Sequence, residues 1–182
     1  MRRKFPAARP PLPAFFVLTV ILLLSGCDLY GKVGGGDANI EGALPYLLQG
    51  EWAFIPGTSG APADGYIITG SAIEYVYHGK SSAGMDFKGD IVFVSNYSSD
   101  SGLIIIKYTV PPAYSGYNGN SFCATYYRGL RSNSVQLANA TTFPAYTCSD
   151  TATLEEAKAK FTRMTMGSYV SWTVTQPQTR IR

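Results

Sequence analysis

The histidine and the acidic residues are the first candidates for catalytic chemistry in this sequence. The chain has one histidine, His78, which a Ser-His-Asp or Cys-His group would require. It stands beside Gly79 and Lys80 between two strand patterns, as a solvated turn residue does. Asp86 and Asp90 flank a glycine turn and could form a pair of glycosidase carboxylates, although turn residues have the same setting. No Gly-x-Ser-x-Gly, His-Glu-x-x-His or Cys/His cluster is present, so we expect a protein that is not an enzyme and holds no metal or cofactor.

The N-terminal segment has the pattern of an export signal. Residues 1–10 contain four cations and no acidic residue. An apolar run of about 11 residues follows at 14–24, which is shorter than the ~20 residues that cross a bilayer as a helix. We therefore predict a signal peptide over residues 1–26 that is cut off.

The cleavage site adds a lipid anchor to this prediction. Leu24-Ser25-Gly26-Cys27 resembles the lipobox of bacterial lipoproteins, with a leucine three positions before the cysteine and two small residues between them. The resemblance implies that Cys27 is diacylglyceryl-modified, becomes the N-terminus and carries acyl chains such as palmitate, which together give lasting anchorage. Asp28 resembles a signal that retains some lipoproteins in the inner membrane, and the expected location is the cell membrane or the outer membrane. The alternative is an ordinary secretory signal with an incidental cysteine.

The charge of the mature chain argues against nucleic acid as a partner. Four of the 15 cations lie in the signal peptide and none of the 12 acidic residues does, which leaves 11 cations against 12 acidic residues. A nucleic-acid-binding protein needs a basic patch or stripe, and none is visible in the sequence. The partners that we expect are the membrane, through the lipid anchor, and a small apolar ligand or an envelope protein.

The mature chain divides into a tether and one domain. Residues 27–45 contain three consecutive glycines at 34–36 and few residues that could form a core, so they are predicted to be a flexible, glycine-rich tether. Residues 46–182 are within the usual size of one domain.

This domain has the pattern of an antiparallel β-fold. Eight short segments rich in Ile, Val, Tyr, Phe and Thr are bounded by Gly, Ser, Asn, Asp or Pro, at 51–55, 64–69, 72–78, 89–97, 102–110, 121–128, 133–140 and 168–174. Tight links at 69–72 and 98–102 favour neighbouring antiparallel strands. The fold class is therefore mainly β, a single up-and-down β-barrel of about eight strands, with a β-sandwich as the alternative.

One segment, 151–162, departs from the strand pattern. Thr153 and Glu156 have the spacing of a capping box, and we predict a helix whose buried side carries Leu154, Ala157 and Phe161. The strands at 89–97 and 102–110 are apolar on both faces. A barrel whose outer face is partly covered by this helix accounts for both features.

The motif at the first strand indicates a family resemblance. Gly50-Glu51-Trp52 opens the first strand, and one helix followed by a short last strand completes the order. In these features the chain resembles the lipocalins, in which the tryptophan of a Gly-x-Trp motif closes one end of an eight-stranded barrel. Residues 46–176 are also similar to a lipocalin-like module of uncharacterised bacterial lipoproteins, a group without assigned chemistry. The lipocalin pattern implies an arginine after the helix that stacks on the tryptophan, and Arg163 is the nearest candidate.

Two cysteines, Cys123 and Cys148, remain besides Cys27, the predicted lipidation site, and we expect the chain that carries them to be exported. Disulfides persist in such compartments, and a loop of 25 residues would restrict the unfolded chain by about 3 kcal/mol. We predict a structural disulfide between them, with two thiols as the alternative.

The aromatic residues are the remaining indication of function. Tyrosine combines an apolar body with a polar tip, which suits a ligand cavity or a protein-binding face but also an ordinary strand. Many tyrosines lie in predicted strands, among them Tyr66, Tyr75, Tyr77, Tyr97, Tyr108, Tyr126 and Tyr127. The loop at 111–121 is the expected exposed binding element or a plain hairpin loop. We expect a lipid-anchored, non-catalytic binding module for a small apolar ligand. The alternative is protein–protein interaction as an adhesin or a structural lipoprotein of the envelope, and no ligand-contacting residue is identified.

Overall fold

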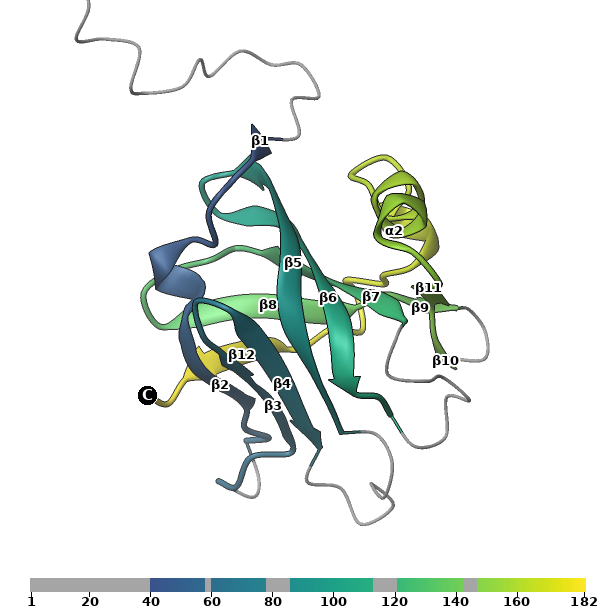
Figure 1. Cartoon of the computed structure of the whole chain (residues 1–182). Coiled ribbons are helices and arrows are strands. Elements are labelled where there is room, and N and C mark those ends of the chain that lie inside the picture. Colours follow the sequence, from purple (N-terminus) through teal and green to yellow (C-terminus); the bar gives the residue numbers. More distant parts are fainter. Residues whose placement is uncertain (1–39, 58–59, 78–85, 113–120, 143–146) are drawn as a thin grey trace, which may run out of the picture. The chain divides into compact units, whose positions relative to one another are not determined.

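Eight antiparallel strands close into a β-barrel in the computed structural model, which describes residues 40–57, 60–77, 86–112, 121–142 and 147–182 (Figure 1). The strands, in chain order, are β2 (Gly50–Phe54), β3 (Asp64–Ile68), β4 (Ala72–Tyr77), β5 (Phe87–Ser98), β6 (Ser101–Val110), β7 (Phe122–Arg128), β8 (Ser134–Asn139) and β12 (Pro177–Arg180). Each pairs with the next along the chain, and β12 closes the barrel by pairing with both β8 and β2. The predicted barrel is confirmed, and the sandwich is not the fold.

Shorter elements surround the barrel. They are β1 (Ile40–Glu41), η1 (Tyr46–Leu48), β9 (Thr141–Thr142), β10 (Thr147–Cys148), β11 (Asp150–Thr151), α2 (Leu154–Lys160) and η2 (Met166–Ser168). Strand β1 pairs with the second half of β5, although its residues were assigned to the tether. The amide of Gly42 continues this contact by donating to the Val94 carbonyl. The ordered domain therefore begins by residue 40.

The last strand lies elsewhere than predicted. Residues 168–174 were expected to form it, but they contain the end of η2 and turns, and β12 follows at 177–180. Hydroxyl groups stabilise these turns: Thr175 donates to the Ser171 carbonyl at 3.0 Å, and the Ser171 and Thr173 hydroxyls are 3.0 Å apart. Local side-chain hydrogen bonds of this kind compete with strand pairing.

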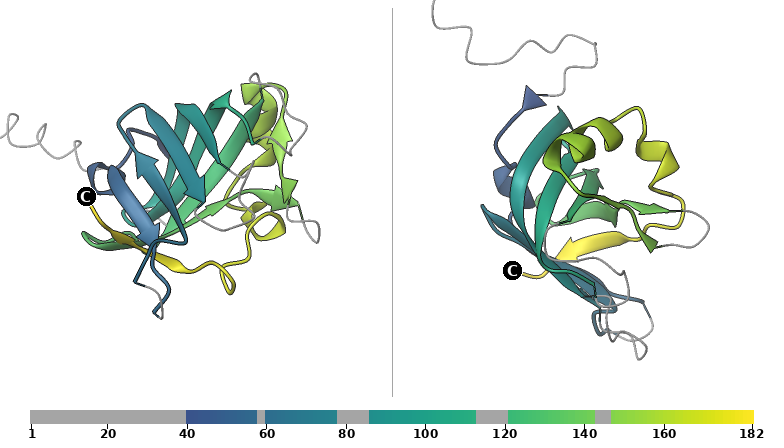
Figure 2. Two further views of the ribbon diagram at one scale, coloured as in Figure 1. Left: turned by 90° about the horizontal axis from the view of Figure 1, so that it is seen from below. Right: turned by 45° about the vertical axis from the view of Figure 1, so that its right-hand side comes forward.

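The single α-helix of the described residues begins as predicted. The Thr153 hydroxyl accepts from the Glu156 amide at 3.2 Å, and the Glu156 carboxylate accepts from the Thr153 amide at 3.2 Å, which completes the capping box. Leu154, Ala157 and Phe161 pack on the outside of the barrel, in the region where Figure 2 shows the helix beside the sheet.

Two apolar clusters explain why the central strands are apolar on both faces. On β6, Ile104 and Ile106 face the barrel interior, whereas Leu103 and Ile105 join the outer cluster under α2. This confirms the arrangement expected for β6. On β5, which also contributes to both clusters, a bulge between Ile91 and Phe93 interrupts the regular alternation and places these two residues in different clusters.

The two ends of the barrel differ. At the end called here the closed end, β-strands are joined by the tight turns 69–71, 99–100 and 129–133, and η1 leads directly into β2. The strand ends joined by the longer connections lie at the opposite end, the loop end.

Candidate functional site

Trp52 and Arg180 together seal the closed end. Trp52 is fully buried and donates its indole N–H to the Leu48 carbonyl at 2.8 Å. The Arg180 guanidinium lies over the indole, with Cζ 4.5 Å from the ring centre. It also donates to the carbonyls of Gln49 at 2.8 Å and of Leu47. The arginine that stacks on Trp52 is therefore Arg180, and the candidate Arg163 was wrong.

Gly50 explains the first position of the Gly-x-Trp motif. Its φ is +145°, a region that side chains rarely allow, and a Cβ there would lie 2.6 Å from Arg180 Nη1 and 2.7 Å from the Arg182 carbonyl oxygen. Glycine is needed because the arginine occupies this space. The motif thus belongs to the packing of the closed end, which leaves the loop end as the side from which a ligand would approach the interior.

Side chains from seven of the eight barrel strands, all except β12, meet in the interior. Fourteen buried residues form this interior cluster: Leu48, Trp52, Tyr66, Ile68, Ile73, Phe87, Ile104, Ile106, Tyr108, Cys123, Tyr127, Leu130, Val135 and Leu137. Leu48 comes from η1 and Leu130 from the turn after β7, so the closed end is covered by apolar side chains as well. The deep part of the barrel is therefore a packed core.

An aromatic row crosses four neighbouring strands toward the loop end. Ring centres are 5.0 Å apart for Tyr66 and Tyr75, 5.4 Å for Tyr75 and Phe87, and 5.6 Å for Phe87 and Tyr108. The Tyr75 hydroxyl donates to the Asp64 carboxylate at 3.3 Å, so a charged group stands beside the row. Aromatic side chains with few polar groups among them are the usual lining of a small-molecule site.

The other tyrosines that the sequence singled out have structural positions. Burial raises the pKa of Tyr97, Tyr126 and Tyr127 well above the ordinary phenol value, because an ionised phenol would be desolvated there. Tyr127 donates to the Asn96 side-chain oxygen at 2.5 Å. The three phenols stay neutral at physiological pH, which does not suit acid or base catalysis. The Tyr77 side chain lies outside the described residues.

The described residues form a concave groove on the outer face of β2, β3 and β4. Its volume is about 240 Å³ and it is lined by Glu51, Trp52, Ala53, Pro62, Gly65, Tyr66, Ile67, Val76 and Ile181. Ala53, Gly65 and Val76 are in register across the three strands. Gly65 contributes no side chain, and a Cβ there would lie 2.6 Å from the Trp52 carbonyl oxygen. The groove exists because no side chain covers the sheet at position 65.

The rim of the groove is apolar and accessible. Ile67 is 39% exposed and Ile181 is 41% exposed. Glu51 is the one charged lining residue, and its carboxylate lies 3.6 Å from Arg182 Nε. Sequence reasoning missed the groove because it depends on a strand glycine and on the C-terminal residues that follow β12.

Of the candidate catalytic residues, the structure describes Asp86 and Asp90. His78 lies outside the described residues, as do Cys27 and most of the loop at 111–121. Asp86 and Asp90 are exposed, and Asp90 is in register with Lys107 across β5 and β6. The described part of the chain contains no group of three or more His, Cys, Asp or Glu residues that could hold a metal ion.

No disulfide is seen among the described side chains, which leave the predicted Cys123–Cys148 bond untested. Cys123 is fully buried in the interior cluster, with its Sγ 3.7 Å from the Ala124 carbonyl oxygen. Cys148 lies on β10, and its side chain is outside the described residues. Asp150, two residues further, pairs with Cys123 across β11 and β7, so the two segments are neighbours.

Among the described residues, no helix is long and apolar enough to cross a membrane. No protein-family model matches the chain, and neither curated proteins nor solved structures include one that is detectably similar to it.

Proposed function

We propose that the protein is a lipid-anchored, non-catalytic binding module of the cell envelope, and that its outer groove binds apolar side chains of an envelope protein. The observation that carries this proposal is the groove at Gly65, which is concave, apolar and built on three paired strands. A rigid scaffold of this kind presents a surface without loss of conformational entropy on binding.

The size and openness of the groove favour a protein partner. A volume of about 240 Å³ is below the ~300–1,000 Å³ that encloses a drug-sized ligand, but it accommodates one or two apolar side chains. Exposed isoleucines at the rim, Ile67 and Ile181, extend the apolar area around it. The packed interior cluster also favours a protein partner over a small ligand inside the barrel, because the deep part of the barrel is filled by its own side chains.

Photo-cross-linking in growing cells tests this proposal. A benzophenone amino acid at position 67 should yield a discrete cross-linked product, whereas the same amino acid at Val174, which is 62% exposed and outside the groove, should not. Ile181→Asp should abolish the product, since a carboxylate at the rim opposes an apolar partner. Equal products at positions 67 and 174, or a product that survives Ile181→Asp, would exclude the groove as the binding site.

A small apolar ligand is the second candidate, and the aromatic row favours it. Tyr66, Tyr75, Phe87 and Tyr108 offer ring faces near the loop end, where Asp64 adds a polar group. Native mass spectrometry of the protein purified without detergent would detect such a ligand as a reproducible added mass. Tyr75→Ala should remove that mass if the row binds it, whereas Ile67→Asp should not.

The lipid anchor at Cys27 belongs to the proposal, and so does the disulfide. Metabolic labelling with an alkyne fatty acid should mark the wild-type chain and leave Cys27→Ser unlabelled. Pairing of β11 with β7 supports proximity of Cys148 to Cys123. A mass two hydrogens below the reduced formula would establish the bond, and two alkylated thiols without reductant would exclude it.

A further inference from the structure

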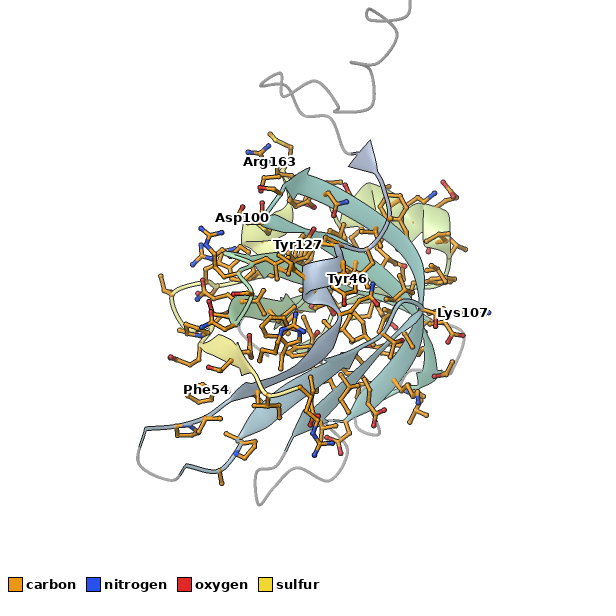
Figure 3. All side chains as sticks on the ribbon, turned by 90° about the vertical axis from the view of Figure 1, so that its left-hand side faces the viewer. Tyr46, Phe54, Asp100, Lys107, Tyr127 and Arg163 are labelled. Carbon is orange, nitrogen blue, oxygen red and sulfur yellow. The ribbon has the colours of Figure 1, made fainter. Side chains whose placement is uncertain are left out.

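The outer face of β2, β3 and β4 carries a row with two projecting isoleucines beside the groove. Ile67 is 39% exposed and lies in register with Glu51 of β2 and Glu74 of β4. Ile181 is 41% exposed, and its amide donates to the Glu51 carbonyl at 2.8 Å, so it continues the same row beyond β2. Figure 3 shows these strands side by side, with Phe54 labelled at the last residue of β2. Two apolar side chains of this projecting row therefore stand out from the face.

The next row of the same face is hollow. Gly65 lies in register with Ala53 and Val76, and all three line the groove of about 240 Å³. Gly65 has no side chain, and Ala53 contributes only a methyl group to this hollow row. Ile67 is two residues from Gly65 along β3, so the two positions point to the same side and are about 7 Å apart. A projecting side chain thus stands directly beside a hollow.

A face with a projection beside a hollow is complementary to a second copy of itself. A two-fold axis between the two rows brings the projecting row of each copy over the hollow row of the other. We propose that the groove binds a second copy of this chain, with Ile67 of each copy in the groove of the other. This inference rests on the proposed function, because it names the partner of the same groove.

The projecting row favours a second copy over an unrelated partner. An unrelated apolar side chain would fill the hollow and leave Ile67 of this chain without a cavity to enter. A second copy supplies both a side chain for the hollow and a hollow for the side chain, so Ile67 becomes buried on both chains. Removal of apolar surface from water is favourable in proportion to the area removed.

The charged groups on this face do not oppose such a pair. In a two-fold contact, charged groups near the axis come close to their own copies, so an excess of one sign would cause repulsion. The Glu51 carboxylate lies 3.6 Å from Arg182 Nε, and the Glu74 carboxylate lies 3.6 Å from Lys88 Nζ. Each carboxylate of the projecting row is therefore matched by a cation of its own chain.

The test uses the full-length chain in growing cells. One copy carries a benzophenone amino acid at position 67 and an affinity tag, and a second copy carries Ile67 and a different tag. Light should yield a product that has both tags, and mass spectrometry of its digest should place the attachment on the second copy among the groove residues. Ile181→Asp in the second copy alone should abolish this product. Val174→Asp in the second copy, at a 62% exposed site outside the groove, should leave it unchanged.

Each outcome separates this inference from the proposed function. If position 67 gives no product, both the groove as a binding site and the second copy are excluded. A product with one tag, joined to a different protein, would keep the groove as a binding site and exclude a second copy as its occupant. A product with both tags that survives Ile181→Asp, or an attachment away from the groove, would exclude the reciprocal packing.

Discussion

The Arg180 guanidinium carbon lies 4.5 Å from the centre of the Trp52 ring, and this contact joins the last strand of the barrel to the first. The same guanidinium donates to the carbonyls of Gln49, Leu47 and Ser132. One side chain thus satisfies carbonyl groups from η1, from the residue before β2 and from the turn after β7.

Replacing Arg180 should therefore destabilise the whole barrel. Arg180→Ala loses the ring contact and leaves partly buried carbonyls without a donor, so we expect a loss of about 2–3 kcal/mol in the free energy of unfolding. Urea unfolding of the non-acylated mature chain measures it. Arg182→Ala, at an 86% exposed side chain, should change stability by less than about 0.5 kcal/mol. Equal effects of the two would contradict a special role for Arg180.

Gly50→Ala should be at least as damaging. The added methyl would lie 2.6 Å from Arg180 Nη1, and φ is +145°, so both the backbone and the guanidinium would have to move. We expect a loss of roughly 2 kcal/mol or more. Gly167→Ala is the matched control, because nothing lies within 4 Å of its Cβ and its φ is not positive; it should leave the midpoint nearly unchanged. The comparison needs thermal unfolding curves of the two variants.

The Tyr97 hydroxyl is expected to cost stability rather than add to it. It is buried and makes no hydrogen bond within the described part of the chain, so Tyr97→Phe should be neutral or stabilise by up to about 1 kcal/mol. Tyr127→Phe removes the 2.5 Å bond to Asn96 and should destabilise by about 1 kcal/mol. If Tyr97→Phe lost as much stability as Tyr127→Phe, the Tyr97 hydroxyl would have to make a stabilising hydrogen bond, and the prediction would be wrong.

Alkaline pH should lower the free energy of unfolding. Burial raises the pKa of Tyr97, Tyr126 and Tyr127, whereas the same phenols titrate near pH 10 in the unfolded chain. Above that pH the unfolded state binds fewer protons than the native state, so stability is full below pH 10 and falls as pH rises. Each phenol contributes a slope of up to about 1.4 kcal/mol per pH unit. Urea titrations between pH 8 and 11.5 would measure the slope, and Tyr97→Phe should reduce it.

Sequence patterns identified the elements whose signals are local. The capping box at Thr153 and the strand patterns at 64–69 and 72–78 depend on neighbours in the chain, and the structure confirms them as the start of α2 and as β3 and β4. The same holds for the two-faced character of β6, because a strand that is apolar on both sides must be covered on both sides.

Features that depend on distant residues were missed. Strand β12 reads Pro-Gln-Thr-Arg and has no strand pattern of its own; it pairs because the edges of β2 and β8 are open on either side of it. The arginine on Trp52 follows from that pairing, so it could not be placed before β12 was. The groove at Gly65 had no signal for a similar reason, since a missing side chain becomes a depression only when strands are aligned.

Because β12 closes the barrel, strand pairing can be completed only after β12 has been synthesised. Strand β2 has one lasting partner, β3, until residues 177–180 arrive to fill the space between it and β8. A chain that emerges N-terminus first therefore keeps an open sheet edge until residues 177–180 have appeared. Contacts between residues so far apart in sequence form slowly. The barrel is therefore expected to close late, after all of its other strands are available for pairing.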